Sequence, residues 1–78
     1  MSQIPLSADV ESLVDRMFPD RPEETRQLLL TYADNEANRV RRGLLVLSQG
    51  RFDLLTHYVA CALRDYRDIL YWAEYPDD

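Results

Sequence analysis

Four residues with metal-binding or acid–base side chains recur at intervals of four. They are Asp53, His57, Cys61 and Asp65. Imidazole, thiolate and carboxylate groups are the usual ligands of zinc. However, a step of four residues rotates a side chain by about 40° around a helix, so no more than two neighbours in this series share a direction. Two ligands do not hold a structural metal ion, and we therefore expect no metal site and no cofactor.

Catalytic chemistry needs more than this chain offers. The sequence holds no Ser-His-Asp set, no H-E-x-x-H motif and no phosphate-binding loop, and His57 is its only histidine. We expect no catalytic residue and predict that the protein is not an enzyme. Cys61 is the only cysteine, which excludes a disulfide within one chain and is typical of a reducing compartment.

The only basic cluster is the segment "NRVRR", which contains Arg39, Arg41 and Arg42. The chain as a whole has a net charge of −5, which repels nucleic acid, and no nucleic-acid recognition motif accompanies the cluster. Nucleic acid is therefore an unlikely partner, and we interpret these arginines as solvated charge paired with nearby acids. The alternative is a small regulator that uses the three arginines to bind either nucleic acid or an enzyme that acts on nucleic acid.

Helices must position all of these residues. Proline at 5, 19, 22 and 76 and glycine at 43 and 50 are the only strong breakers, and no segment alternates like a strand. The pattern predicts one all-α domain over residues 1–78. Its helices are expected at about 8–18, 21–48 and 53–74, where apolar residues recur at helical spacing.

The short "SQGRF" connection predicts that the two long helices lie antiparallel. The expected fold is an antiparallel helical hairpin of two long helices plus a short N-terminal helix, a three-helix unit. In this register Glu36 and Tyr66 face each other as a buried polar pair, because a buried carboxylate needs a hydrogen-bond donor. Gly43 is expected to make room for the ring of Tyr58.

The closing stretch "RDYRDILYWAEYPDD" places Tyr71, Trp72 and Tyr75 away from the centre of the predicted apolar face. Tyrosine, tryptophan and arginine are enriched at the energetic centres of protein interfaces, so these rings with Arg64 and Arg67 form a candidate interface. Three coverings stay open. The N-terminal helix packs over Trp72, a second copy of the chain does so, or a different protein does.

The first ten residues lack the pattern of an export signal, and no stretch reaches the roughly 20 apolar residues that span a bilayer. The sequence thus predicts a cytoplasmic protein without a membrane partner. Its charge is uneven. Residues 1–36 carry eight acids and three arginines, whereas residues 37–78 carry six of each.

The segment from Leu44 to Pro76 resembles the C-terminal half of a group of small uncharacterised bacterial proteins. The shared pattern is an L-x-L-(S/A)-x-G turn at Leu45–Gly50, an acidic helix start at Asp53, and a D-Y-R-D-(V/I)-L-x-x-A-E-Y-P ending at Asp65–Pro76. The resemblance implies a bacterial cytoplasmic protein and no known activity. Taken together, the sequence favours a non-enzymatic helical interaction module that self-associates.

Overall fold

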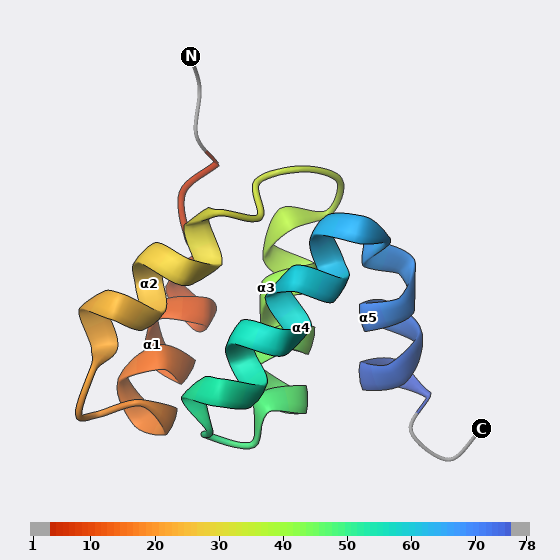
Figure 1. Ribbon diagram of the computed structural model, residues 1–78. Helices are drawn as coiled ribbons and strands as arrows, with labels where there is room; N and C mark the ends of the chain where they lie inside the picture. The colour runs from red at the N-terminus through yellow and green to blue at the C-terminus, as the bar shows by residue number, and fades with distance from the viewer. Residues whose placement is uncertain (1–3, 76–78) are drawn as a thin grey trace.

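The structure is a computed structural model that describes residues 4–75. This part of the chain folds into five α-helices and is otherwise loop and turn (Figure 1). The helices are α1 (Ala8–Met17), α2 (Pro22–Leu30), α3 (Ala37–Ser48), α4 (Phe52–Arg64) and α5 (Tyr66–Glu74). None of the described helices is long and apolar enough to cross a membrane.

Local sequence signals explain where several helices begin and end. Phe18 closes α1 just before Pro19, and Pro22 occupies the first turn of α2, where its missing N–H is harmless. Glu23 and Glu24 also lie in that turn, where negative charge suits the positive end of the helix dipole. The turn between α3 and α4 contains Gly50 with a φ of 78°, a conformation that glycine adopts without strain.

The expected helix over residues 21–48 is wrong, because it is interrupted between Leu30 and Ala37. Asp34 and Asn35 lie in this break, and such side chains compete with the helical backbone for hydrogen bonds. The Tyr32 hydroxyl donates to the Asn35 carbonyl at 2.8 Å, and Glu36 has a left-handed φ of 51°. The chain therefore turns here without a proline or a glycine.

The expected helix over residues 53–74 is also wrong, because it divides at Asp65 into α4 and α5. Asp65 is extended, with φ −156° and ψ 99°, and its side chain accepts a hydrogen bond from the Arg67 backbone N–H at 3.1 Å. An aspartate in this position caps a new helix. The predicted hairpin of two long helices plus a short one is thus replaced by an all-α globule of five helices.

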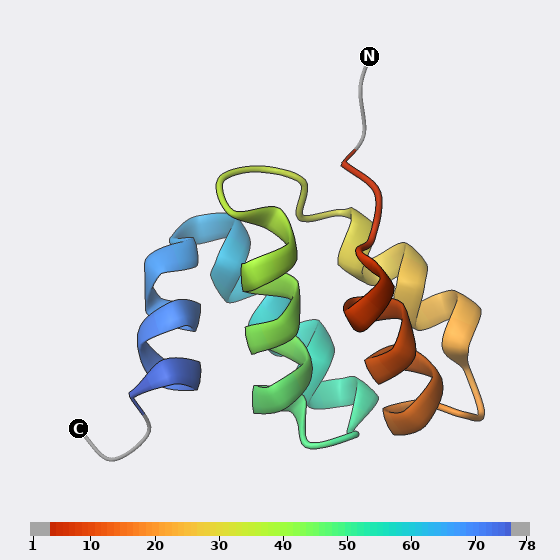
Figure 2. The ribbon, with the colours of Figure 1, turned by 180° about the vertical axis from the view of Figure 1, so that it is seen from behind.

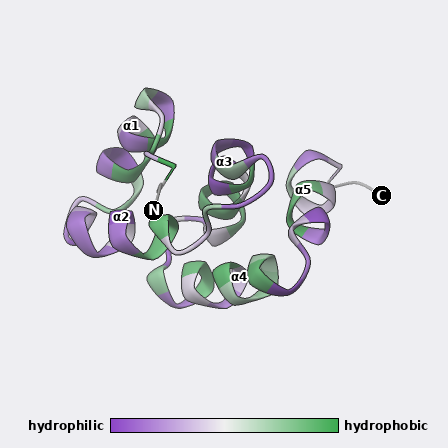
Figure 3. Ribbon diagram, turned by 90° about the horizontal axis from the view of Figure 1, so that it is seen from above, coloured by the Kyte–Doolittle hydropathy of each residue, from purple (hydrophilic) through white to green (hydrophobic). Residues whose placement is uncertain are grey.

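Helix α3 lies at the centre of the molecule. It packs against α1, α4 and α5, while α1 also packs against α2. Seen from behind, α1 and α5 stand on opposite sides of α3 (Figure 2). The view from above shows α4 running along one face of α3 toward α5 (Figure 3). The core joins side chains of all five helices, among them Val14, Leu29, Leu44, Val59 and Ile69.

Gly43 is the point of closest approach between α3 and α5. A Cβ added there would lie 3.2 Å from the Ile69 Cγ2 atom and 3.2 Å from the Ala73 Cβ atom. The glycine therefore makes room for α5, and not for Tyr58 as expected. Its lack of a side chain brings α5 against the central helix.

Arg41 is fully buried within the α3 side of the core. Its Nε donates to the carbonyls of Leu29 and Tyr32, both at 3.1 Å, at the place where α2 ends. The two terminal nitrogens donate to Ile4, Pro5 and Asn38, at 2.9, 3.2 and 3.0 Å. One side chain thus joins the N-terminal segment, the end of α2 and the start of α3.

The cap at Asp65 predicts an acid-sensitive α5. The Arg67 guanidinium, and then the Arg67 backbone N–H, hold the pKa of Asp65 below its ordinary value. A carboxylate whose pKa is lowered by folding stabilises the fold above its unfolded pKa, near pH 4, and that contribution is lost as pH falls through the folded value. We therefore expect the fluorescence of Trp72, the only tryptophan and a residue of α5, to change on acidification below about pH 4.

The control for this prediction is Asp65→Asn. Asparagine also caps helices but does not titrate, so the acid-induced change should be smaller in this variant than in the wild type. An equal change in both proteins would show that other carboxylates cause it.

Candidate interaction surface on α4 and α5

Aromatic rings gather where α5 lies beside α4. Tyr58 on α4 meets Trp72 on α5 edge to face, with ring centroids 6.2 Å apart and planes at 62°. His57 lies against Tyr58 at 5.2 Å, and Tyr71 lies against Tyr75 at 5.8 Å. We call these five residues the aromatic face.

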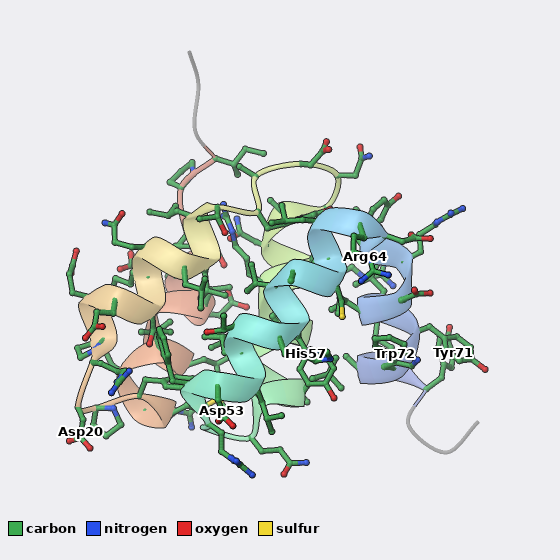
Figure 4. The ribbon with its side chains drawn as sticks, viewed as in Figure 1. Asp20, Asp53, His57, Arg64, Tyr71 and Trp72 are labelled. Atoms are coloured by element: carbon green, nitrogen blue, oxygen red, sulfur yellow. The ribbon has the colours of Figure 1, made fainter. Side chains whose placement is uncertain are left out.

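The rings on α5 remain largely exposed. The exposed fractions are 42% for Trp72, 49% for Tyr71 and 57% for Tyr75. Figure 4 shows Tyr71 pointing outward from α5, while Trp72 lies between it and His57. Large aromatic side chains gain most when they are desolvated, so an exposed group of them on two adjacent helices is suited to a binding surface.

The N-terminal helix does not cover Trp72. Helix α1 packs against α2 and α3, on the opposite side of the molecule from α5 (Figures 1 and 2). The interpretation in which α1 lies over the tryptophan is therefore wrong. The reason is that the break at residues 31–36 lets α2 fold back and form a pair with α1 beside α3.

The two candidate interface arginines border this surface at the junction of α4 and α5. Arg67 pairs with Asp65 through two hydrogen bonds of 2.9 and 3.0 Å, and this contact raises the pKa of the arginine. Arg64 is exposed and makes no ion pair with the other residues of the range 4–75. Arg64 therefore keeps its full charge available at the edge of the aromatic face.

The buried polar pair Glu36–Tyr66 is not present. Glu36 is exposed and binds Arg39 at 3.1 Å, because the interrupted helix removes it from the buried side. Tyr66 is half-buried and packs near Tyr32, with ring centroids 6.4 Å apart. The tyrosine with a shifted pKa is instead Tyr32. Burial, and then the charge of Asp34, raise its pKa to about 12.

Of the three arginines of "NRVRR", two pair with acids as expected. Arg39 donates to Glu74 of α5, a contact that lowers the pKa of the glutamate, and Arg42 donates to Asp9 of α1 at 2.8 Å. Arg41 was expected at the surface but is buried. Burial lowers its pKa, but an arginine side chain does not lose its proton in proteins, so the guanidinium stays charged. The three therefore do not form a common basic surface.

A pocket of about 640 Å³ lies between the α2–α3 loop and the α4–α5 junction. Its wall includes Tyr32, Asp34, Arg64, Asp65 and Tyr66. Charges of both signs line it, and Asp65 already holds Arg67. The pocket is therefore a polar recess at the end of the aromatic face, without a strong preference for an anion or a cation.

The four residues with metal-binding side chains do not form one cluster in the structure. Asp53 binds Arg51 at 3.0 Å and Asp65 binds Arg67, so each carboxylate has its own cation. His57 and Cys61 do come together, with 3.8 Å between the His57 Nε2 and Cys61 Sγ atoms. No group of three or more histidine, cysteine or acidic side chains in the described part of the chain could hold a metal ion.

No protein-family model, curated protein or solved structure matches this chain. The resemblance of its C-terminal segment to small bacterial proteins stays a prediction.

Sequence reasoning identified the α5 part of the aromatic face but missed the α4 part. The sequence predicts that Tyr58 faces Gly43 in the interior and assigns His57 no place in an interface. The break at Asp65 turns α5 back along α4 and brings Trp72 to Tyr58. The sequence does contain one signal for a helix start at this place, because Asp65 is a good N-cap residue. However, no proline or glycine lies there to indicate that the preceding helix ends.

Proposed function

We propose that the protein is a non-enzymatic interaction module that forms a homodimer through the aromatic face. The observation that carries this proposal is the exposure of Tyr71, Trp72 and Tyr75 on one helix, uncovered by α1. Tryptophan and tyrosine dominate the binding energy of interfaces because they bury a large area with few rotatable bonds. In a two-fold dimer the same rings serve on both sides of the contact.

The charge distribution favours a second copy as the partner. The acidic excess belongs to residues 1–36, which include α1, α2 and the loop that follows α2, whereas residues 37–78 carry six acids and six arginines. The aromatic face thus lies on the neutral half of the chain, and α1 and α2 lie across α3 from α5 (Figure 2). Contact through this face keeps α1 and α2 of the two copies apart, which reduces the repulsion expected from a net charge of −5 on each.

Chain length gives a further argument for a partner. A chain of 78 residues buries only about 60% of the surface that its unfolded form exposes, so its core has a thin margin of stability. Dimerisation is a common way to add apolar burial in such small proteins.

We also propose a reducing compartment such as the cytoplasm for this protein, since its single cysteine is a free thiol.

The test is the mass of the protein in solution. We expect wild-type protein to reach the mass of a dimer in sedimentation equilibrium, and Tyr71→Ala combined with Trp72→Ala to remain a monomer at the same concentration. Loss of one energetic centre of an interface costs at least about 2 kcal/mol, or roughly a 30-fold weaker affinity. The double variant should therefore shift the dissociation constant by more than that factor.

The matched control is Val46→Ala combined with Leu63→Ala. Both residues are large, apolar and exposed, but they lie outside the aromatic face. This control should keep the dimer. A wild-type protein that stays monomeric throughout the accessible concentration range, or a control that dissociates as readily as the double variant, would overturn the proposal.

A further inference from the structure

His57 belongs to the aromatic face, and the half-buried Cys61 lies one helical turn further along α4, beside that face. The His57 Nε2 and Cys61 Sγ atoms are 3.8 Å apart. A tetrahedral zinc ion with bonds of about 2.3 Å to sulfur and about 2.05 Å to nitrogen holds these two donor atoms roughly 3.6 Å apart. The pair therefore already has the separation that one zinc ion requires of two of its ligands.

One copy of the chain supplies only half of such a site. Structural zinc has four protein ligands, and the nearest acids in the α4 series, Asp53 and Asp65, are each engaged by an arginine. A second copy related by a two-fold axis brings a second His57 and a second Cys61. A two-fold axis that passes beside His57 and Cys61 would complete the set of four ligands, and it would also bring the two aromatic faces together.

We propose that His57 and Cys61 form half of a zinc site that is completed by the same two residues of a second copy. This inference rests on the proposed homodimer and specifies where its two-fold axis passes. Each Cys61 thiol binds as a thiolate and releases its proton to solvent, and each His57 binds as neutral imidazole through Nε2. Two thiolates balance the two positive charges of the ion, so the completed site carries no net charge into the interface.

The surroundings suit a metal at this position. The ring of Tyr58 contacts the rings of both His57 and Trp72, so aromatic side chains would shield the ion once two copies meet. An apolar shell lowers the local dielectric and strengthens bonds between a metal and its thiolates. Cys61 is half-buried on this side of α4 and makes no disulfide in the described chain.

The experiment adds zinc chloride to metal-free full-length protein and follows mass and heat of binding together. We expect one zinc ion per two chains and a dimer tightened on the order of 100-fold, the upper part of the range for coupling between two binding events. Cobalt chloride in place of zinc should produce the absorption of a tetrahedral thiolate-bound cobalt ion. Cys61→Ser and His57→Ala should each abolish these effects, with the helix content unchanged.

The matched control is Asp53→Asn, which removes the acid one turn before His57 and should bind zinc as the wild type does. One zinc per chain without a change in mass, or unaltered binding by Cys61→Ser, would overturn the zinc site. In that case the proposed homodimer stands if metal-free protein still dimerises and Tyr71→Ala with Trp72→Ala still dissociates it. If neither the metal-free nor the zinc-loaded protein forms a dimer, both proposals fall.

Discussion

Replacement of Arg41 by methionine is expected to lower the free energy of unfolding by about 3–5 kcal/mol. Methionine fills a similar volume but donates no hydrogen bond. The Tyr32 carbonyl, which Arg41 binds at 3.1 Å, would then lose its donor, whereas the Leu29 carbonyl would keep the Tyr32 backbone N–H at 3.2 Å. Leaving a buried acceptor without a donor costs about 1–3 kcal/mol.

This loss is large for so small a protein. A chain of 78 residues has a total stability of roughly 4–12 kcal/mol, so the variant should lose a large share of it and unfold at a clearly lower urea concentration. The N-terminal segment should also become more sensitive to protease, because Arg41 binds the Ile4 and Pro5 carbonyls at 2.9 and 3.2 Å. Urea unfolding followed by circular dichroism measures the first effect, and limited proteolysis measures the second.

Two further substitutions separate the causes. Arg41→Lys keeps the charge but presents one compact ammonium group, which cannot reach acceptors on both sides as the planar guanidinium does, so it should be intermediate in stability. Arg42→Met makes the same change one position later, where the side chain binds Asp9 near the surface. Its cost should stay within about 1 kcal/mol. Equal stability of Arg41→Met and Arg42→Met would contradict the structural role of Arg41.

Replacement of Ile69 by alanine should destabilise the protein by about 2–5 kcal/mol. Ile69 is fully buried, and its Cγ2 atom would lie only 3.2 Å from a Cβ at Gly43. Helices α3 and α5 are therefore already in close contact at this point. They cannot move together to fill the space that the substitution leaves, which puts the expected cost in the upper part of the range.

The matched control is Leu63→Ala, which also removes an aliphatic side chain but at an exposed position of α4. We expect it to change the stability by no more than about 0.5 kcal/mol. Urea unfolding monitored by Trp72 fluorescence is suitable for both variants, since Trp72 lies on α5 close to Ile69. A cost below about 1 kcal/mol for Ile69→Ala would show that α5 does not depend on this contact.

Loss of the Ile69 side chain should also weaken the proposed dimer. Helix α5 carries Tyr71, Trp72 and Tyr75, and its buried side holds them in place against α3. An undocked α5 would separate Trp72 from Tyr58. Dimer formation should therefore weaken in Ile69→Ala but not in Leu63→Ala.

Several features of the candidate surface follow from the sequence because they depend on local position alone. Tyr71 and Tyr75 are four residues apart on a short helix, so they share a side wherever that helix lies. Glu36 shows the limit of this reasoning. Its expected burial depended on an unbroken helix from Leu30 to Ala37, and the turn at Asp34 and Asn35 placed it in solvent.

The sequence by itself determined that the chain is helical, where α1 begins and ends, that α2 starts at Pro22, and that the chain turns at Gly50. These are local properties of proline, glycine and apolar spacing, which act within a few residues. Only the tertiary structure decided the breaks at 31–36 and at Asp65, the burial of Arg41, and the partner of Gly43. At each of these places a weak local preference is stabilised by contacts with residues far along the chain, and such contacts have no period in the sequence.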